Sequence, residues 1–201
     1  EFYGLTTMRT GIEKSRNLMT VRLADKIGMK KIIKTVNDFG IYDDIDEQLS
    51  MSLGSGLVTL INITNAYGMI ANGGTKIKPK IIKSIYSKEG LKIYNTNQKT
   101  CNNCKLSEID KSFKIPTIKN NIKKVIDPKI AYQITSMLEG VITRGTGKKL
   151  KDLNIPIAGK TGTTNENKDA WFVGYTPNLV IGVYIGYDQP KTLGYKQTGS
   201  S

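Results

Sequence analysis

Apolar residues recur at intervals of three and four along the first forty positions, which is the spacing of one face of an α-helix. The apolar positions of this stripe are Leu18, Val21, Ile27, Ile32, Ile33, Val36 and Phe39. Gly28 and Gly40 stand directly after two of the apolar runs, where glycine commonly ends a helix. The pattern therefore predicts two or three short helices with a shared buried stripe.

Two further helices are marked by the residues that precede their apolar runs. Thr59 is a hydroxyl N-cap for a helix that extends through Ala71 and stops at Asn72-Gly73-Gly74. Asp127-Pro128 combines an N-cap with proline at the first helical position. The buried face expected for this second helix, which runs toward Gly145, consists of Ile130, Ile134, Met137, Leu138 and Val141.

Strands are indicated where polar and apolar positions alternate. The stretch KPKIIKSIYSKEGLKIYN alternates around Glu89-Gly90 and predicts a β-hairpin. Near the end, IPIAGKTGT, DAWFVGYT and LVIGVYIGYD predict three strands, the last two joined at Pro177-Asn178. Residues 96–124 are polar and weakly periodic, which favours a loop or an insertion. Helices first and a sheet last predict an α+β fold.

Composition narrows the class of protein without assigning a function. The 201 residues with 38% hydrophobic content suit one soluble domain, or a large part of one. The chain opens at Glu1 with no initiator methionine and no leader sequence, so we expect a piece of a longer protein. Residues 56–70 are the most apolar segment, but they are too short and too polar to span a bilayer as a helix.

The formal net charge of +13 raises the question of nucleic-acid binding. The sequence has only four arginines, its lysines are scattered, and aromatic residues do not alternate with them as a stacking surface requires. We therefore expect no nucleic-acid partner, and we attribute the lysines to solubility or to attraction toward an anionic surface.

Signatures of a metal or cofactor are missing from the sequence. Cys101 and Cys104 form a single Cys-x-x-Cys in a chain without histidine, so nitrogen and sulfur ligands cannot build a closed four-ligand zinc site. Either a local disulfide or two free thiols fits these cysteines. A phosphate-binding P-loop requires glycine where Asn154 stands, and a dinucleotide-binding turn requires glycine where Leu150 stands. We expect no metal and no cofactor.

The lack of histidine also restricts nucleophilic catalysis. A Ser-His-Asp triad and a Cys-His dyad are excluded, so lysine is the practical base for an activated hydroxyl. Ser15-Arg16-Asn17 lies between predicted helices, and Lys160-Thr161-Gly162-Thr163 lies on a predicted strand. These are two of the three motifs shared by penicillin-binding proteins and class A β-lactamases.

The residue types of the second motif suit recognition of a carboxylate. Thr161 and Thr163 share one face of an extended strand, where two hydroxyls bind a carboxylate while Lys160 supplies positive potential nearby. Gly162 keeps this approach free of a side chain, and the Thr163 N–H is a donor suited to a developing oxyanion. In isolation the motif equally fits a strand lysine followed by turn residues.

The first motif supplies groups for proton transfer and amide binding. The Ser15 hydroxyl has a proton that it is able to pass to a leaving amine, and the Asn17 amide offers both a donor and an acceptor to a substrate amide. In isolation so short a motif as Ser-x-Asn favours a helix cap. Trp171 and Phe172, on the strand after Lys-Thr-Gly, are expected in the core and in the wall of a groove.

Four longer stretches carry a resemblance that extends beyond the motifs: GIEKSRNLMTVRLADKIG, LSMSLGSGLVTLINITNAYGMIANGG, AYQITSMLEGVITRGTG and IPIAGKTGTTNENKDAWFVGYTPNLVIGVYIGYDQPKTLG. With them, the chain closely resembles the C-terminal transpeptidase domain of class A, bifunctional penicillin-binding proteins, except in residues 91–124. The resemblance implies the serine penicillin-recognising α+β fold, an antiparallel sheet packed with helices, here truncated on its N-terminal side. We divide this partial domain into a helical part (1–75), a hairpin with an insertion loop (76–126), and a helix with strands (127–201).

The resemblance implies D,D-transpeptidation of peptidoglycan by the parent protein. A serine attacks the D-Ala-D-Ala carbonyl, an amine from a neighbouring stem peptide resolves the acyl-enzyme, and β-lactams react with the same serine. Ser15 would be the relay hydroxyl, Asn17 the amide anchor, Lys160 the electrostatic partner, and Thr161 with Thr163 the carboxylate clamp on either side of Gly162. Because no serine is followed by lysine three positions on, we expect the nucleophile to precede this piece and the piece alone to be inactive.

The parent would also carry a glycosyltransferase, and an anchor outside this piece would hold it at the periplasmic face of the bacterial inner membrane. Its partners would be the peptidoglycan stem peptide and β-lactams. A D,D-carboxypeptidase, a β-lactamase-type relative, a non-catalytic β-lactam sensor and a cell-wall binding module share parts of the pattern and stay open as alternatives.

Overall fold

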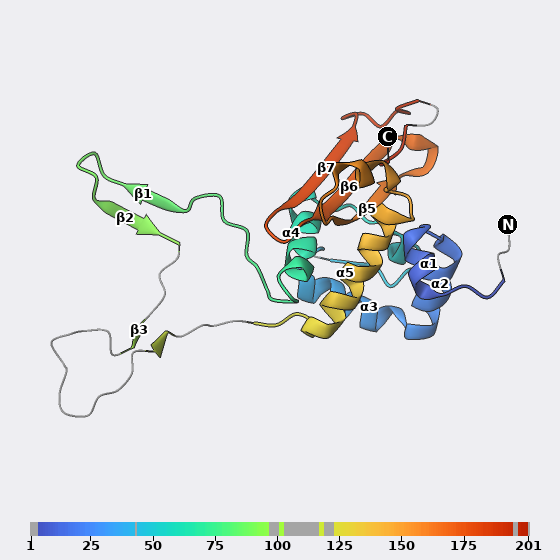
Figure 1. Cartoon of the computed structure of the whole chain (residues 1–201), viewed down its shortest axis with the longest axis horizontal. Helices are drawn as coiled ribbons and strands as arrows, with labels where there is room; N and C mark the ends of the chain where they lie inside the picture. Colours follow the sequence, from blue (N-terminus) through green and yellow to red (C-terminus); the bar gives the residue numbers. More distant parts are fainter. Residues whose placement is uncertain are drawn as a thin grey trace. The chain divides into compact units, whose positions relative to one another are not determined.

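The structure of the chain is a computed structural model that describes residues 4–42, 44–96, 101–102, 117–118, 123–194 and 197–200. It contains two compact units, one made of residues 1–77 with 124–201 and the other of residues 78–123 (Figure 1). Within the described part, no helix has both the length and the apolar character needed to cross a membrane.

Three short helices begin the first unit, as the sequence predicts: α1 (Met8–Glu13), α2 (Asn17–Ile27) and α3 (Met29–Phe39). Gly28 (φ 88°) ends α2 and Gly40 (φ 68°) ends α3, because glycine adopts a positive φ at little cost. The predicted burial of Leu18 and Ile27 is wrong, since these side chains are 51% and 41% exposed. Both lie in the terminal turns of α2, and the helix buries Ala24 instead.

The two capped helices also form. A short 3-10 helix, η1 (Leu49–Leu53), precedes α4 (Leu60–Ala71), where the Thr59 hydroxyl accepts the Asn62 N–H at 3.3 Å. Helix α5 (Pro128–Thr143) begins where the Asp127 carboxylate accepts the Lys129 N–H at 2.8 Å. Both N-caps are therefore confirmed.

The buried face of α5 differs from the prediction at its start. Ile130 is 48% exposed, so its predicted burial is wrong, whereas the next residue, Ala131, is 1% exposed. Farther along, Leu138 and Val141 are buried as predicted. The apolar spacing identified the helix, but the neighbours of its first turn decided which residue faces the core.

Replacing Asp127 with alanine removes the N-cap of α5 and should lower the free energy of unfolding by about 1 kcal/mol. Urea denaturation followed by circular dichroism measures the loss. Asp25→Ala is the control, because Asp25 is an exposed residue inside α2 and its replacement should change stability by less than about 0.5 kcal/mol. Equal losses for the two variants would show that the cap contributes nothing.

A three-stranded antiparallel sheet completes the first unit, in the order β5 (Ala158–Thr163), β6 (Asp169–Tyr175) and β7 (Val180–Gly186). These are the three strands predicted at the end of the chain. The Thr176 N–H bonds to the Leu179 carbonyl across the predicted turn between β6 and β7. Two 3-10 helices, η3 (Lys148–Leu153) and η4 (Asn165–Asn167), flank β5.

Helices α4 and α5 lie against one face of this sheet (Figure 1). The core between them contains Leu138 and Val141 of α5, Ala158 of β5 and Tyr175 of β6. The packing of Val141 and Leu138 on Ala158 fixes β5 relative to α5. The position of the Lys-Thr-Gly strand therefore depends on where α5 lies.

The second unit contains the predicted hairpin, formed by β1 (Ser84–Tyr86) and β2 (Lys92–Asn95). Inside the segment predicted as a loop or insertion, β3 (Cys101–Asn102) pairs antiparallel with β4 (Thr117–Ile118). Cys104 lies outside the described residues, so the pairing of the two cysteines stays a prediction.

Candidate active site

Ser15 lies in the connection between α1 and α2, at the point where α1 ends. The Arg16 N–H bonds to the Gly11 carbonyl at 2.9 Å and the Ser15 N–H to the Ile12 carbonyl at 3.1 Å, which is the pattern of a Schellman helix end. Ser15 occupies the left-handed position of this motif with φ 52°, where glycine is usual. Backbone strain of this kind, kept at a residue that bears a side chain, is common at active sites.

Lys160 extends from β5 to the Ser15 connection. Its ammonium donates to the Ser15 hydroxyl at 2.9 Å and to the Thr161 carbonyl at 2.9 Å. Burial lowers the pKa of Lys160, because the charged form loses solvation. The two motifs, 145 residues apart along the chain, therefore meet at one hydrogen bond.

The two threonines of the second motif lie on the opposite face of β5 from Lys160. In the register, Thr161 pairs with Phe172 and Thr163 with Ala170, whereas Lys160 pairs with Val173. Side chains alternate along a strand, so the shared face predicted for the threonines is present, and Lys160 lies on the face toward α5. The candidate site therefore straddles the edge of β5, with the lysine on one side and the hydroxyls on the other.

Both threonine hydroxyls already have a hydrogen-bond partner. The Thr161 hydroxyl lies 2.8 Å from the Thr146 hydroxyl, on the segment that follows α5. The Thr163 hydroxyl accepts the Gly199 N–H at 3.1 Å. Since a hydroxyl that accepts one hydrogen bond still has its own proton, Thr163 remains able to donate to a carboxylate.

Gly162 and Asn17 have surroundings that the sequence did not reveal. A Cβ added at Gly162 would lie 3.1 Å from the Cβ of Trp171, so this glycine also allows the close packing of β5 on β6. Asn17 is the first residue of α2 and its side chain is exposed. The helix-cap alternative for Ser-x-Asn applies only in part: Ser15 ends α1 through its backbone, and α2 has no side-chain N-cap.

A group of contacts next to Ser15 was missed by the sequence analysis. Glu13, at the end of α1, accepts two hydrogen bonds from Arg144 at the end of α5. Lys14 donates from the same connection to the Arg144 carbonyl at 2.6 Å. The two segments lie 131 residues apart, and no periodicity or short motif links a glutamate in one to an arginine in the other.

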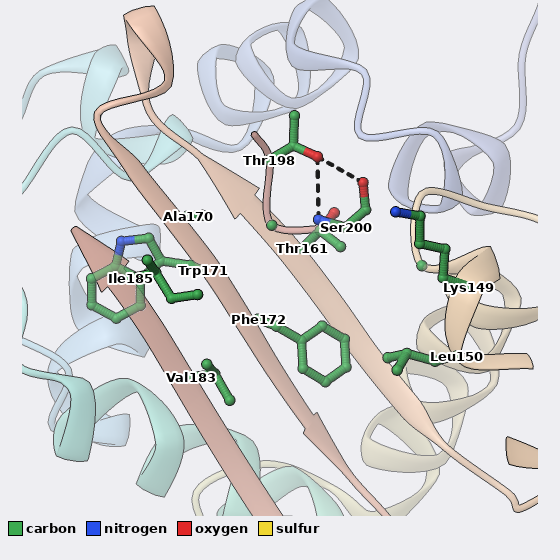
Figure 2. A pocket seen from close by; sticks show the side chains of 12 residues that line it. Lys149, Leu150, Thr161, Ala170, Trp171, Phe172, Val183, Ile185, Thr198 and Ser200 are labelled. Carbon is green, nitrogen blue, oxygen red and sulfur yellow. Dashed lines mark hydrogen bonds between the residues drawn. The ribbon is translucent and has the colours of Figure 1, made fainter. Parts of the chain in front are cut away.

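A cavity of about 240 Å³ lies on the threonine face of the sheet (Figure 2). Figure 2 shows Phe172 on β6 and Val183 and Ile185 on β7. Leu150 of η3 lies beyond the opposite edge of the sheet from Ile185. Trp171 and Phe172 both line this cavity, which fits the expected groove wall. Both are only partly buried, so their expected place in the core is wrong. Thr161 borders it, but Ser15 and Lys160 do not, so the cavity is separate from the serine–lysine contact.

A Ser-x-Asn motif and a Lys-Thr-Gly motif that meet at a hydrogen bond in an α+β fold are typical of penicillin-recognising serine proteins. The chain belongs to the penicillin binding protein transpeptidase domain family, whose sequence profile matches residues 2–201. The resemblance inferred from the sequence is thereby confirmed, together with the α+β fold that it implied.

Curated relatives agree with the family assignment. Penicillin-binding protein 1A of Rickettsia bellii is 50% identical over 202 residues, covering 100% of this chain and 26% of the relative. Penicillin-binding protein 1A of Pseudomonas aeruginosa is 31% identical, covering 100% of this chain and 28% of the relative. The chain thus spans about a quarter of the length of these proteins.

Solved structures agree on the fold. The crystal structure of penicillin-binding protein 1A from Haemophilus influenzae has a TM-score of 0.81 at 28% identity, covering 97% of this chain and 32% of that chain. The PonA1 protein from Mycobacterium tuberculosis in complex with penicillin V has a TM-score of 0.76 at 22% identity, covering 100% of this chain and 54% of that chain. The second likeness shows the shared fold alone.

Proposed function

We propose that the full-length protein to which this chain belongs is a peptidoglycan D,D-transpeptidase, and that the chain is a partial transpeptidase domain within it. The observation that carries the proposal is the 2.9 Å hydrogen bond from Lys160 to the Ser15 hydroxyl, because it joins the two family motifs in space. Family membership over residues 2–201 and relatives named penicillin-binding protein 1A support it.

The reaction begins when a serine outside this chain gives its hydroxyl proton to its own lysine base and attacks the carbonyl carbon between the two D-alanines. The carbonyl electrons move onto its oxygen, where the Thr163 N–H donates to the oxyanion. The intermediate collapses as the Ser15 hydroxyl gives its proton to the leaving D-alanine amine, and the Lys160 ammonium replaces that proton. An amine of a second stem peptide then attacks the acyl-enzyme carbonyl, and the serine leaves with the proton that the amine loses. The proton taken up by the lysine base in the first step is the one that restores the Lys160 ammonium. A β-lactam stops at the acyl-enzyme, because its leaving nitrogen stays attached to the acyl group.

The nucleophile of this scheme has no counterpart in the 201 residues. Each serine lacks a lysine three positions on, so the attacking serine and its lysine base lie in another part of the full-length protein. The chain by itself therefore supplies the relay hydroxyl, the ammonium and the substrate clamp, and has no acylating group of its own.

The stem peptide binds along the edge of β5 as an additional strand. Among the described residues β5 pairs with β6 alone, which leaves its second edge available to a peptide backbone. The hydroxyls of Thr161 and Thr163 hold the terminal carboxylate, and Gly162 lies between them. Asn17, exposed at the start of α2, binds an amide of the peptide.

The length of the relatives supports further domains in the full-length protein. This chain covers 26% of Penicillin-binding protein 1A of Rickettsia bellii, which leaves room for further domains in a protein of that kind. The full-length protein carries a glycosyltransferase and acts at the periplasmic face of the inner membrane, held by an anchor outside this chain.

A free carboxylate on the stem peptide should be required for turnover by the full-length protein. A pentapeptide ending in D-Ala-D-Ala should lose its terminal D-alanine about tenfold faster than its C-terminal amide loses D-alaninamide, because only the free carboxylate makes charge-assisted hydrogen bonds with the clamp. Thr163→Val should remove most of this preference. Mass spectrometry of the released D-alanine or D-alaninamide and of the cross-linked peptide measures both steps, with Tyr132→Phe, on the exposed side of α5, as the control.

The outcomes separate the rival functions. Release of D-alanine with no cross-linked product would identify a D,D-carboxypeptidase instead. Turnover of neither peptide would contradict an enzymatic role for the full-length protein. Intact-mass analysis of the 201-residue chain after exposure to benzylpenicillin should show no adduct, and an adduct would refute a nucleophile outside the chain.

A further inference from the structure

The end of α1 is joined to the end of α5 by a two-point ion pair. Arg144 Nη2 lies 2.5 Å from Glu13 Oε1, and Arg144 Nε lies 3.3 Å from Glu13 Oε2. Glu13 is 5% exposed and is the only charged residue buried in the part of the chain that the structure describes. A buried carboxylate needs a charged and hydrogen-bonded partner, and here the fork of the guanidinium supplies both.

The surroundings of this pair are shaped to hold it. A Cβ added at Gly140 of α5 would lie 2.0 Å from Glu13 Oε1, and one added at Gly145 would lie 2.2 Å from the Glu13 carbonyl oxygen. That same carbonyl accepts the Thr146 N–H at 3.1 Å. Two glycines and one backbone hydrogen bond therefore bring the end of α1 into direct contact with the end of α5.

The pair joins the ends of two helices, and each half of the candidate active site is attached to one of them. Ser15 follows Glu13 by two residues and is held in a strained left-handed conformation, so its position depends on what anchors the end of α1. Lys160 belongs to β5, which packs on α5 through Ala158 and Val141. A link between the ends of α1 and α5 therefore connects the segment that carries Ser15 with the helix on which the Lys160 strand packs.

We propose that Glu13 and Arg144 are positioning residues that keep the Ser15 hydroxyl within hydrogen-bonding distance of Lys160. Neither side chain touches the reacting atoms in this scheme, and both act through the Ser15 connection. The expected effect on the acylation rate rests on the proposed function. The expected effect on the position of the Ser15 connection does not depend on it.

The test uses the full-length protein with Glu13→Gln, with Arg144→Met and with both changes together. The limiting rate of acylation by a fluorescent penicillin should fall about tenfold in each variant, while the affinity for the unreacted β-lactam changes less than about twofold. The double variant should lose no more than the worse single variant, because the two side chains act as one unit. Arg144→Lys retains a charged donor for Glu13 and should recover part of the rate.

Hydrogen exchange followed by mass spectrometry supplies a readout that does not need activity. Peptides containing the amides of Ser15, Arg16 and Thr146 should exchange faster in Glu13→Gln and Arg144→Met, while peptides from β6 and β7 should exchange as in the wild type. Lys34→Met is the matched control, because it removes the salt bridge between Lys34 and Asp38 of α3. The side chains of both residues are exposed. This control should change neither the acylation rate nor the exchange near Ser15.

Unchanged exchange near Ser15 in both variants would overturn the positioning role, whatever the acylation result. Faster exchange throughout β6 and β7 would also overturn it, because the pair would then merely stabilise the fold. A loss confined to β-lactam affinity would contradict it as well. If the wild-type protein forms no adduct with the fluorescent penicillin, the proposed function fails, and hydrogen exchange still decides whether the pair holds the Ser15 connection.

Discussion

Replacing Lys160 with methionine in the full-length protein should lower the rate of acylation by benzylpenicillin by roughly 10² to 10³-fold. The Lys160 ammonium donates to the Ser15 hydroxyl at 2.9 Å, and methionine has a similar length without the charge or the protons. When Ser15 gives its proton to the leaving nitrogen, the methionine at position 160 cannot supply a new proton to the Ser15 oxygen. Competition with a fluorescent penicillin, measured on gels over time, reports the rate.

The same lysine should set the alkaline limit of activity. Burial lowers the pKa of Lys160 below that of a solvated lysine. The ammonium is present below this pKa and is lost as pH rises through it, so the wild-type rate should decline on the alkaline side. Lys160→Arg keeps its charge over the same pH range, and its residual rate should lack this decline. An identical decline in the arginine variant would show that a different group titrates.

Replacing Gly140 with alanine should lower the free energy of unfolding by about 2 to 3 kcal/mol, although alanine is the better helix former. The new Cβ would lie 2.0 Å from Glu13 Oε1 and 2.8 Å from Arg144 Nη2, so the carboxylate must leave its position. The cost comes from a buried Glu13 that loses its partner. It is smaller than for a fully buried pair, because the Arg144 side chain is 58% exposed.

Gly68 of α4 provides a matched comparison with the opposite expected sign. Gly68 and Gly140 are each the fourth residue from the end of their helix. A Cβ at Gly68 would meet Val180 at 3.7 Å and Ile77 at 3.9 Å, which are ordinary contacts. Gly68→Ala should therefore raise stability by up to about 1 kcal/mol. Urea denaturation of both variants measures the two changes, and destabilisation of similar size in both would contradict the role assigned to Glu13.

Local features of the fold were predictable from the sequence because their causes lie within a few residues. The Thr59 and Asp127 caps bond to N–H groups two or three positions away, so a residue type at a fixed offset marks each helix start. Strands β5, β6 and β7 were predictable in the same way, from alternating polar and apolar residues and from the turn residues between them. Gly40 ends α3 for an equally local reason, its positive φ.

The exposure of particular apolar residues was not predictable in the same way. Leu18 and Ile130 have the spacing of a buried face, yet both are about half exposed. Periodicity reports which residues share a helix face, whereas burial depends on which elements cover each turn of that face. Ala131, one residue on, takes the position next to the core that was assigned to Ile130.

The sequence by itself determined the helix starts, the three final strands, the two motifs and the family, since each is encoded by neighbouring residues or by a continuous pattern. Only the tertiary structure decided that Ser15 and Lys160 share a hydrogen bond, that the threonines face away from Lys160, and that Glu13 pairs with Arg144. These contacts join residues that are far apart in the chain. Their geometry follows from how α1, α5 and β5 pack, and helix packing depends on the combined shape of many side chains.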